Sequence, residues 1–123
     1  MSDRHQLGDL LLQVIVDPRG VVVQWHGKSV AMDPQSLLDP YLSEVIVRAR
    51  MLRVGLMHDF TTLDFFNSST ISTLLRHVRD VERHEVPIHI RYSKAQRWQR
   101  TFFDAFGCAR ESTARVRIEP IGS

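Results

Sequence analysis

The sequence has only one cysteine in 123 residues, Cys108, and so has no pair that could form an internal disulfide. A chain without disulfides is typical of a reducing compartment, which favours the cytoplasm. The first residues are polar and hold no apolar segment or cleavage signature of a secretory leader. No apolar run approaches the roughly 18 residues that cross a bilayer. We therefore expect a cytoplasmic protein with no membrane-spanning segment.

The residue patterns of common metal and catalytic sites are also missing. The six histidines do not form a His-x-x-x-His motif, and the lone cysteine cannot supply a Cys pair. The six glycines do not cluster into a phosphate-binding loop, and no Gly-x-Ser-x-Gly motif surrounds Ser69. We therefore expect no metal, no cofactor and no enzymatic activity.

The charge of the chain is nearly balanced. It has 16 Lys+Arg against 14 Asp+Glu, and its arginines are scattered rather than gathered in a patch. This distribution does not favour a nucleic-acid partner. The content of 43% hydrophobic and 24% charged residues is typical of a soluble globular protein. We expect one domain over residues 1–123, with residues 1–8 as a polar lead.

Apolar segments separated by turn residues predict the strands. Residues 10–16 and 21–26 are rich in Val, Leu and Ile, and the Asp-Pro-Arg-Gly segment of residues 17–20 favours a hairpin turn between them. Three later segments are also predicted strands: residues 54–60, 88–92 and 114–121.

Helical spacing of apolar residues predicts three helices. The first is expected over residues 40–52, with Asp39 as its N-cap and Pro40 at its first position, while the earlier Asp33-Pro34 pair predicts either a turn or a helix start. The second spans about residues 68–84. The third begins at residue 93 or 95 and ends before Gly107, which is placed to close it. On this last helix Phe103 lies off the apolar stripe and is expected to be exposed.

The element order β-β-α-β-α-β-α-β predicts an α/β domain. Strands that follow one another through a helix become parallel by right-handed crossovers, whereas the initial hairpin is antiparallel. We therefore expect a mixed, mostly parallel sheet of about five strands with the helices mainly on one face.

The stretch from Leu63 to Arg79 combines an apolar run, a polar step and an amphipathic helix. Asn67 or Ser68 can cap the helix, because a side-chain oxygen there accepts from the free first-turn N–H groups. The expected buried face consists of Ile71, Leu74, Leu75 and Val78. The hydroxyls in the first turn lie at the positive end of the helix, where an anion is tolerated. The pattern alone leaves both a capping role and a functional role open.

This element order and the Phe-Phe-Asn-Ser-Ser-Thr-Ile segment of residues 65–71 resemble the STAS domain, the fold of bacterial anti-sigma factor antagonists. The usual signature of that family is Asp-Ser-Ser-Gly, so Asn67 replaces its acidic residue and Thr70 replaces its glycine. The Pro-Ile-His-Ile segment of residues 87–90 and the Trp98-Gln99 pair are similar to a STAS-like subgroup of bacterial signalling regulators.

The resemblance implies a partner-switching regulator. Ser69 matches the serine that is phosphorylated in such antagonists, with Ser68 and Thr70 as alternatives. The implied partners are an ATPase that is both kinase and anti-sigma factor, and a phosphatase that reverses the modification. The implied partner-binding residues are Asn67, Ser68, Ser69, Thr70, Ser72, Thr73, Arg76 and Asp80. The last four are expected on the exposed side of the helix, with Arg76 and Asp80 spaced to form an ion pair.

Two other functions remain open. The chain could be a STAS-fold scaffold or homodimerisation module without phosphorylation, in which case residues 67–70 form only a capping turn. It could also bind a small ligand or nucleotide, which predicts a polar pocket near residues 59–69.

Overall fold

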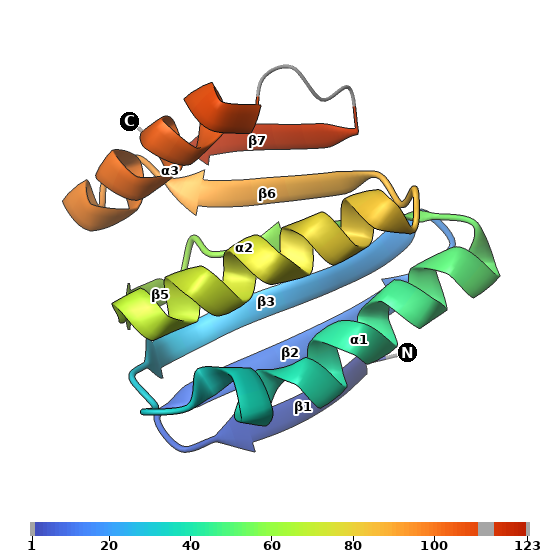
Figure 1. Cartoon of the computed structure of the whole chain (residues 1–123), viewed down its shortest axis with the longest axis horizontal. Helices are drawn as coiled ribbons and strands as arrows, with labels where there is room; N and C mark the ends of the chain where they lie inside the picture. The colour runs from blue at the N-terminus through green and yellow to red at the C-terminus, as the bar shows by residue number, and fades with distance from the viewer. Residues whose placement is uncertain (1, 111–114, 123) are drawn as a thin grey trace.

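The computed structural model describes residues 2–110 and 115–122, and the side chains of all of these except 108–110. Seven strands and three helices make up the described part of the chain (Figure 1). The strands are β1 (Ser2–Leu7), β2 (Leu10–Asp17), β3 (Gly20–Ser29), β4 (Gly55–Asp59), β5 (Leu63–Phe66), β6 (Ile88–Ser93) and β7 (Val116–Ile121). The helices are α1 (Pro34–Leu52), α2 (Ser68–Arg83) and α3 (Arg97–Arg110).

All the described strands join one sheet in the order β1-β2-β3-β4-β6-β7, with β5 paired to β3 at the end where β4 has stopped. The first two pairings are antiparallel and the others are parallel. The mixed, mostly parallel sheet is therefore confirmed, as is the hairpin turn, which pairs Asp17 with Gly20. The sheet is larger than the expected five strands because β1 and β5 were not predicted.

The polar lead predicted for residues 1–8 is wrong, because Ser2–Leu7 forms the edge strand β1. It pairs antiparallel with β2, from Ser2 opposite Ile15 to Leu7 opposite Leu10. Gly8 adopts a φ of 65° in the tight turn between the two strands, a conformation that glycine permits. An edge strand needs only one neighbour and can expose polar side chains, so its sequence lacks the apolar signal of an inner strand.

The helices cover one face of the sheet, as predicted (Figure 1). Alternate residues of each strand point to that face. Large buried side chains there include Leu12, Trp25, Leu56 and Ile90, which form one core with Leu38, Leu42, Leu74 and Val78 of the helices. The side chains between them point to the opposite face, which carries no helix. We call that surface the open face.

Helix α1 starts six residues earlier than predicted. Its N-cap is Asp33, which accepts hydrogen bonds from the backbone N and the Oγ of Ser36 at 3.3 and 2.7 Å, and Pro34 occupies the first helical position. Pro40 lies inside the helix and is exposed, so water can hydrate the Ser36 carbonyl that its missing N–H leaves free. Asp39 and Pro40 therefore do not mark the helix start, although their sequence has the same form as Asp33-Pro34.

Helix α3 also departs from the prediction. It continues to Arg110, so Gly107 lies within the helix and does not close it, because glycine permits the closing conformation without imposing it. Phe103 is only 1% exposed, with its ring 5.2 Å from those of Phe60 and Tyr92, so its expected exposure is wrong. The predicted start of the last strand, Ala114, lies outside the described residues.

No helix among the described residues is long and apolar enough to cross a membrane.

Candidate functional site

The N-terminus of α2 is held by Asn67. The Asn67 Oδ1 accepts from the Thr70 backbone N–H at 2.9 Å and so caps the helix, while Nδ2 donates to the Ala31 carbonyl at 3.0 Å. The Asn67 backbone N–H donates to the carbonyl of Ser29 at 3.0 Å. One side chain thus joins the helix start to the loop that follows β3. The predicted cap and the predicted start of this helix are confirmed.

Thr70 and Thr73 point inward. Thr70 is 1% exposed, and its Oγ1 lies 2.8 Å from the Ser29 hydroxyl and 2.7 Å from the Asn67 Oδ1. Thr73 is 3% exposed and donates its hydroxyl to the Ser69 carbonyl at 3.1 Å. The expected exposure of Thr73 is therefore wrong, and Thr70 presents no accessible hydroxyl for a kinase.

The buried face of α2 is rotated from the one that apolar spacing predicts. It consists of Thr70, Thr73, Leu74, His77, Val78 and Val81, whereas the predicted members Ile71 and Leu75 are only half-buried. Small hydroxyl and imidazole side chains occupy inward positions because each finds a hydrogen-bond partner there. A count of apolar residues cannot reveal this.

Ser68 and Ser69 are exposed, and no described residue accepts from or donates to their hydroxyls. The first turn of α2 holds no acidic side chain, so the positive end of the helix is not neutralised from within that turn. Ser72 and Arg76 are exposed farther along the helix. Asp80 is half-buried and forms an ion pair with Arg83 at 3.6 Å, so the expected Arg76–Asp80 pair is wrong.

Exposed apolar side chains occur in the two segments that adjoin this helix end. Val30 and Met32, in the loop that Asn67 binds, are 45% and 98% exposed, and Phe65 on β5 is 45% exposed. The Phe65 ring packs edge-on against Trp98, with 6.1 Å between the ring centroids. The two free hydroxyls therefore lie beside an exposed apolar surface, which we call the apolar rim: Val30, Met32 and Phe65. Large exposed apolar side chains that gather in this way are typical of binding surfaces.

Three buried polar side chains on β3, β4 and the inner face of α2 form a hydrogen-bonded series. The Trp25 Nε1–H donates to the Nδ1 of His58 at 3.0 Å, which places the His58 proton on Nε2. That Nε2–H then donates to the Nε2 of His77, 2.8 Å away on α2. Burial lowers the pKa of His77 to about 4, and burial together with repulsion from His77 lowers the pKa of His58 well below its ordinary value. Both imidazoles are therefore neutral at pH 7.

Gln99 on α3 fixes the segment that leads into the site. This side chain is fully buried, and its Nε2 donates to the carbonyls of Phe60 and Leu63 at 2.7 and 2.9 Å. Its Oε1 accepts from the Ser93 backbone N–H at 2.7 Å. Gln99 thus holds the turn between β4 and β5, and β5 leads directly to Asn67. The Trp98-Gln99 pair in the sequence was the signal for this contact, but it did not reveal the role.

No group of three or more potential metal ligands occurs among the described residues. The two buried histidines instead hydrogen-bond each other and Trp25.

The bond to Ala31 gives a structural reason for asparagine at position 67. In Asn67→Asp a carboxylate oxygen would face the Ala31 carbonyl, now 3.0 Å from Nδ2, and the hydrogen bond would be lost. We expect the free energy of unfolding to fall by about 1–2 kcal/mol, although a charge at a helix N-terminus alone is stabilising. Denaturant unfolding at pH 7.5 measures it.

Ser68→Asp is the matched control, since it adds the same charge at the same helix end and leaves the bond to Ala31 intact. It should be neutral or stabilising. If the Asn67→Asp protein were at least as stable as the wild type, the hydrogen bond to Ala31 would not be the reason for asparagine at position 67.

The sequence matches no protein-family model and no curated protein. Among solved structures it is similar to the phosphorylated form of SpoIIAA, a Bacillus cell-fate determinant, with 17% identity and a TM-score of 0.60 over 91% of this chain and 92% of that one. It is also similar to an uncharacterized protein from Shewanella loihica PV-4, with 11% identity and a TM-score of 0.55 over 97% of this chain and 90% of that one. The second protein is described as having a SpoIIAA-like fold. The predicted fold is thus confirmed: the chain has the SpoIIAA-like fold of STAS domains.

Proposed function

We propose that this protein is a non-enzymatic signalling regulator of the anti-sigma factor antagonist type. It binds a protein partner in the cytoplasm through the N-terminal end of α2, and phosphorylation of Ser69 switches that binding. The observation that carries the proposal is the free, exposed Ser69 hydroxyl at an unneutralised helix N-terminus, beside the apolar rim. SpoIIAA, which has a phosphorylated form, shares the fold.

The contacts disfavour Thr70 as the phosphoacceptor, and the STAS resemblance favours Ser69 over Ser68. Thr70 is buried and hydrogen-bonded to Ser29 and Asn67, so a phosphate there would disrupt the cap. Ser68 is also exposed, but Ser69 is the residue that matches the modified serine in the STAS resemblance. A phosphate on Ser69 would lie close to first-turn N–H groups that have no acceptor within the helix.

The switch needs no large conformational change. Phosphorylation adds roughly −1.5 to −2 charges near neutral pH. A partner that covers the apolar rim would have to bury this charge, and its affinity would fall. The helix start itself tolerates an anion, so the domain stays folded. The proposed partners are an ATPase that acts as both kinase and anti-sigma factor, and a phosphatase that restores the free hydroxyl.

The test first captures the partner by pull-down from a lysate of the native host and then compares its affinity for three variants. Ser69→Asp mimics the charge and is expected to weaken binding at least tenfold, whereas Ser69→Ala should bind within about twofold of the wild type. Ser43→Asp, at an exposed serine on α1, is the control for charge alone and should bind normally. Isothermal titration calorimetry with the purified partner measures all of them.

Equal affinity of Ser69→Asp and the wild type would overturn the phosphoswitch. If that affinity also survived in Ser69→Ala, the chain would be a scaffold that binds through this helix end without modification, with residues 67–70 acting only as a cap.

A further inference from the structure

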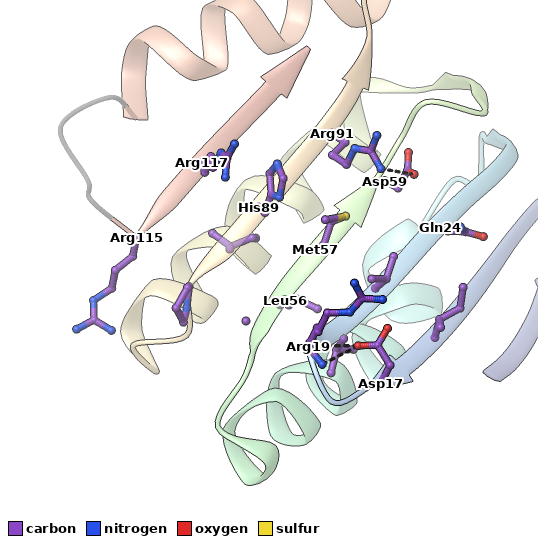
Figure 2. Close-up of a pocket in the computed structure, with 17 residues that line it drawn as sticks. Asp17, Arg19, Gln24, Leu56, Met57, Asp59, His89, Arg91, Arg115 and Arg117 are labelled. Carbon is purple, nitrogen blue, oxygen red and sulfur yellow. Dashed lines mark hydrogen bonds and ion pairs between the residues drawn. The ribbon is translucent and has the colours of Figure 1, made fainter. Parts of the chain in front are cut away.

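The open face of the sheet carries a cavity of about 710 Å³ (Figure 2). It extends from the hairpin turn between β2 and β3 across β4 and β6 to β7, and its volume is in the range of small-molecule sites. Helix α2 with Ser69 packs against the other face of the sheet. The cavity is therefore separate from the proposed partner-binding site.

The floor of the cavity is apolar. Ile15, Val22 and Met57 project from three adjacent strands, β2, β3 and β4, and are half-buried with no helix over them. Cross-strand register places Ile15 opposite Val22, and Val22 beside Met57, so the three form a continuous row. Covering an apolar floor of this kind with a ligand is favourable, because it removes apolar surface from water.

Two arginines, Arg19 and Arg117, lie on opposite sides of this floor. Arg19 extends from the hairpin turn, while Arg117 projects from β7 next to His89 (Figure 2). Both are exposed, and neither guanidinium forms an ion pair or hydrogen bond with another described residue. They can therefore pair with an external anion.

The acidic groups around the cavity already have partners. The Asp17 Oδ1 accepts from the backbone N–H groups of Arg19 and Gly20 at 2.7 and 3.2 Å, which forms the turn. Asp59 accepts from the Thr61 backbone and hydroxyl and lies 3.9 Å from Arg91. Glu119, beside the cavity, lies 3.6 Å from the Nε of Arg91 and 3.0 Å from the Nε2 of His89.

Counting the lining side chains gives four arginines (Arg19, Arg91, Arg115 and Arg117) against two aspartates (Asp17 and Asp59), an excess of positive charge. Arg91 is balanced by Asp59 and Glu119, and Arg115 donates to the Glu85 carbonyl at 2.6 Å. Arg19 and Arg117, at the two sides of the apolar floor, are therefore the lining arginines whose guanidinium groups have no partner among the described residues.

We propose that this cavity binds a small amphipathic anion. The apolar body of the ligand would lie on Ile15, Val22 and Met57, and its phosphate, carboxylate or sulfonate group would pair with Arg19 or Arg117. The cavity combines an apolar floor with a few polar groups that fix orientation, which is the usual composition of a ligand site. The proposal does not involve Ser69, so it stands or falls separately from the phosphoswitch.

The test uses two dyes that share an apolar body. 1-Anilinonaphthalene-8-sulfonate carries a sulfonate, whereas N-phenyl-1-naphthylamine is its neutral analogue. Fluorescence titration at pH 7.5 should show saturable binding of one sulfonate dye per chain, weakened at least tenfold in Arg19→Gln/Arg117→Gln. The neutral dye should bind the wild type and this variant equally. Thermal unfolding of each variant confirms that it is folded.

Arg76→Gln/Arg100→Gln is the matched control, since it removes two exposed arginines from the helices. It should leave both titrations within about twofold of the wild type. The proposal is overturned if the sulfonate dye does not bind, or if the two double variants bind it equally. Vesicles of phosphatidylglycerol that displace the dye would assign the anion to a lipid headgroup, and vesicles that leave it bound would assign it to a soluble ligand.

Discussion

Replacing Gln99 by leucine is expected to lower the free energy of unfolding by about 3–5 kcal/mol. The substitution would remove the Gln99 partner of the Leu63 carbonyl and of the Ser93 N–H, and the Phe60 carbonyl would keep only its hydrogen bond from the Leu63 N–H at 3.0 Å. Each polar group stranded in the interior costs about 1–3 kcal/mol, and Gln99 is fully buried. Denaturant unfolding at pH 7.5 measures the loss.

Gln35→Leu, at an exposed position in the first turn of α1, is the control for the change of side chain and should alter stability by less than about 0.5 kcal/mol. A loss below about 1 kcal/mol in Gln99→Leu would mean that water or a rearranged loop replaces the three hydrogen bonds. The expected loss of stability would show that α3, through Gln99, stabilises the segment that leads into the N-terminal end of α2.

Acidification is expected to destabilise the fold through the buried histidines. The pKa of His77 is about 4 in the folded protein, whereas it is 6.5 in an unfolded chain. The unfolded state therefore binds more protons between these two pH values. As the pH is lowered through that window, the free energy of unfolding decreases. The contribution of His77 is complete above pH 6.5 and decreases by about 2 kcal/mol by pH 5. The lowered pKa of His58 acts in the same direction.

His77→Gln isolates this effect, because glutamine can still accept from the Nε2–H of His58 but does not titrate. The stability difference between wild type and His77→Gln should shift by about 2 kcal/mol against the wild type between pH 7.5 and pH 5. If the free energies of unfolding of the wild type and His77→Gln had the same pH dependence, His77 would not be buried in its neutral form.

Local signals in the sequence were sufficient for most of the fold. The Asp-Pro-Arg-Gly turn, the helix cap at Asn67 and the alternation of residues 88–92 each depend on neighbours in the chain, and the structure confirms all three. The start of α1 was misplaced because the Asp-Pro pair occurs twice, at Asp33 and at Asp39. Only packing of Leu38 into the core shows which pair begins the helix.

The buried polar contacts could not be predicted in the same way. Trp25 and His58 are 33 residues apart, and His58 and His77 are 19 apart, so each partner is brought in by a different element. Without knowledge of these pairs, Thr70, Thr73 and His77 look like exposed polar positions on an amphipathic helix. The burial of Thr70 and Thr73 removes them from the proposed partner surface. The members that remain on α2 are exposed Ser68, Ser69, Ser72 and Arg76 and half-buried Asp80.

The two proposed sites lie on opposite faces of the sheet. The N-terminal end of α2 offers free hydroxyls beside exposed apolar side chains, which suits a protein partner and a phosphate. The open face offers an apolar floor between two free arginines, which suits a small anion. Each can be tested in a variant that leaves the other unchanged.

The most direct test of the phosphoswitch is a phosphosite map of the protein purified from the organism that encodes it. Intact mass would give the fraction that carries one phosphate, and fragmentation would give its position. We predict a single phosphate on Ser69, in a fraction that changes with growth conditions, and none on Thr70 or Thr73. A protein that carries no phosphate under any growth condition, or carries it only on another residue, would contradict the account.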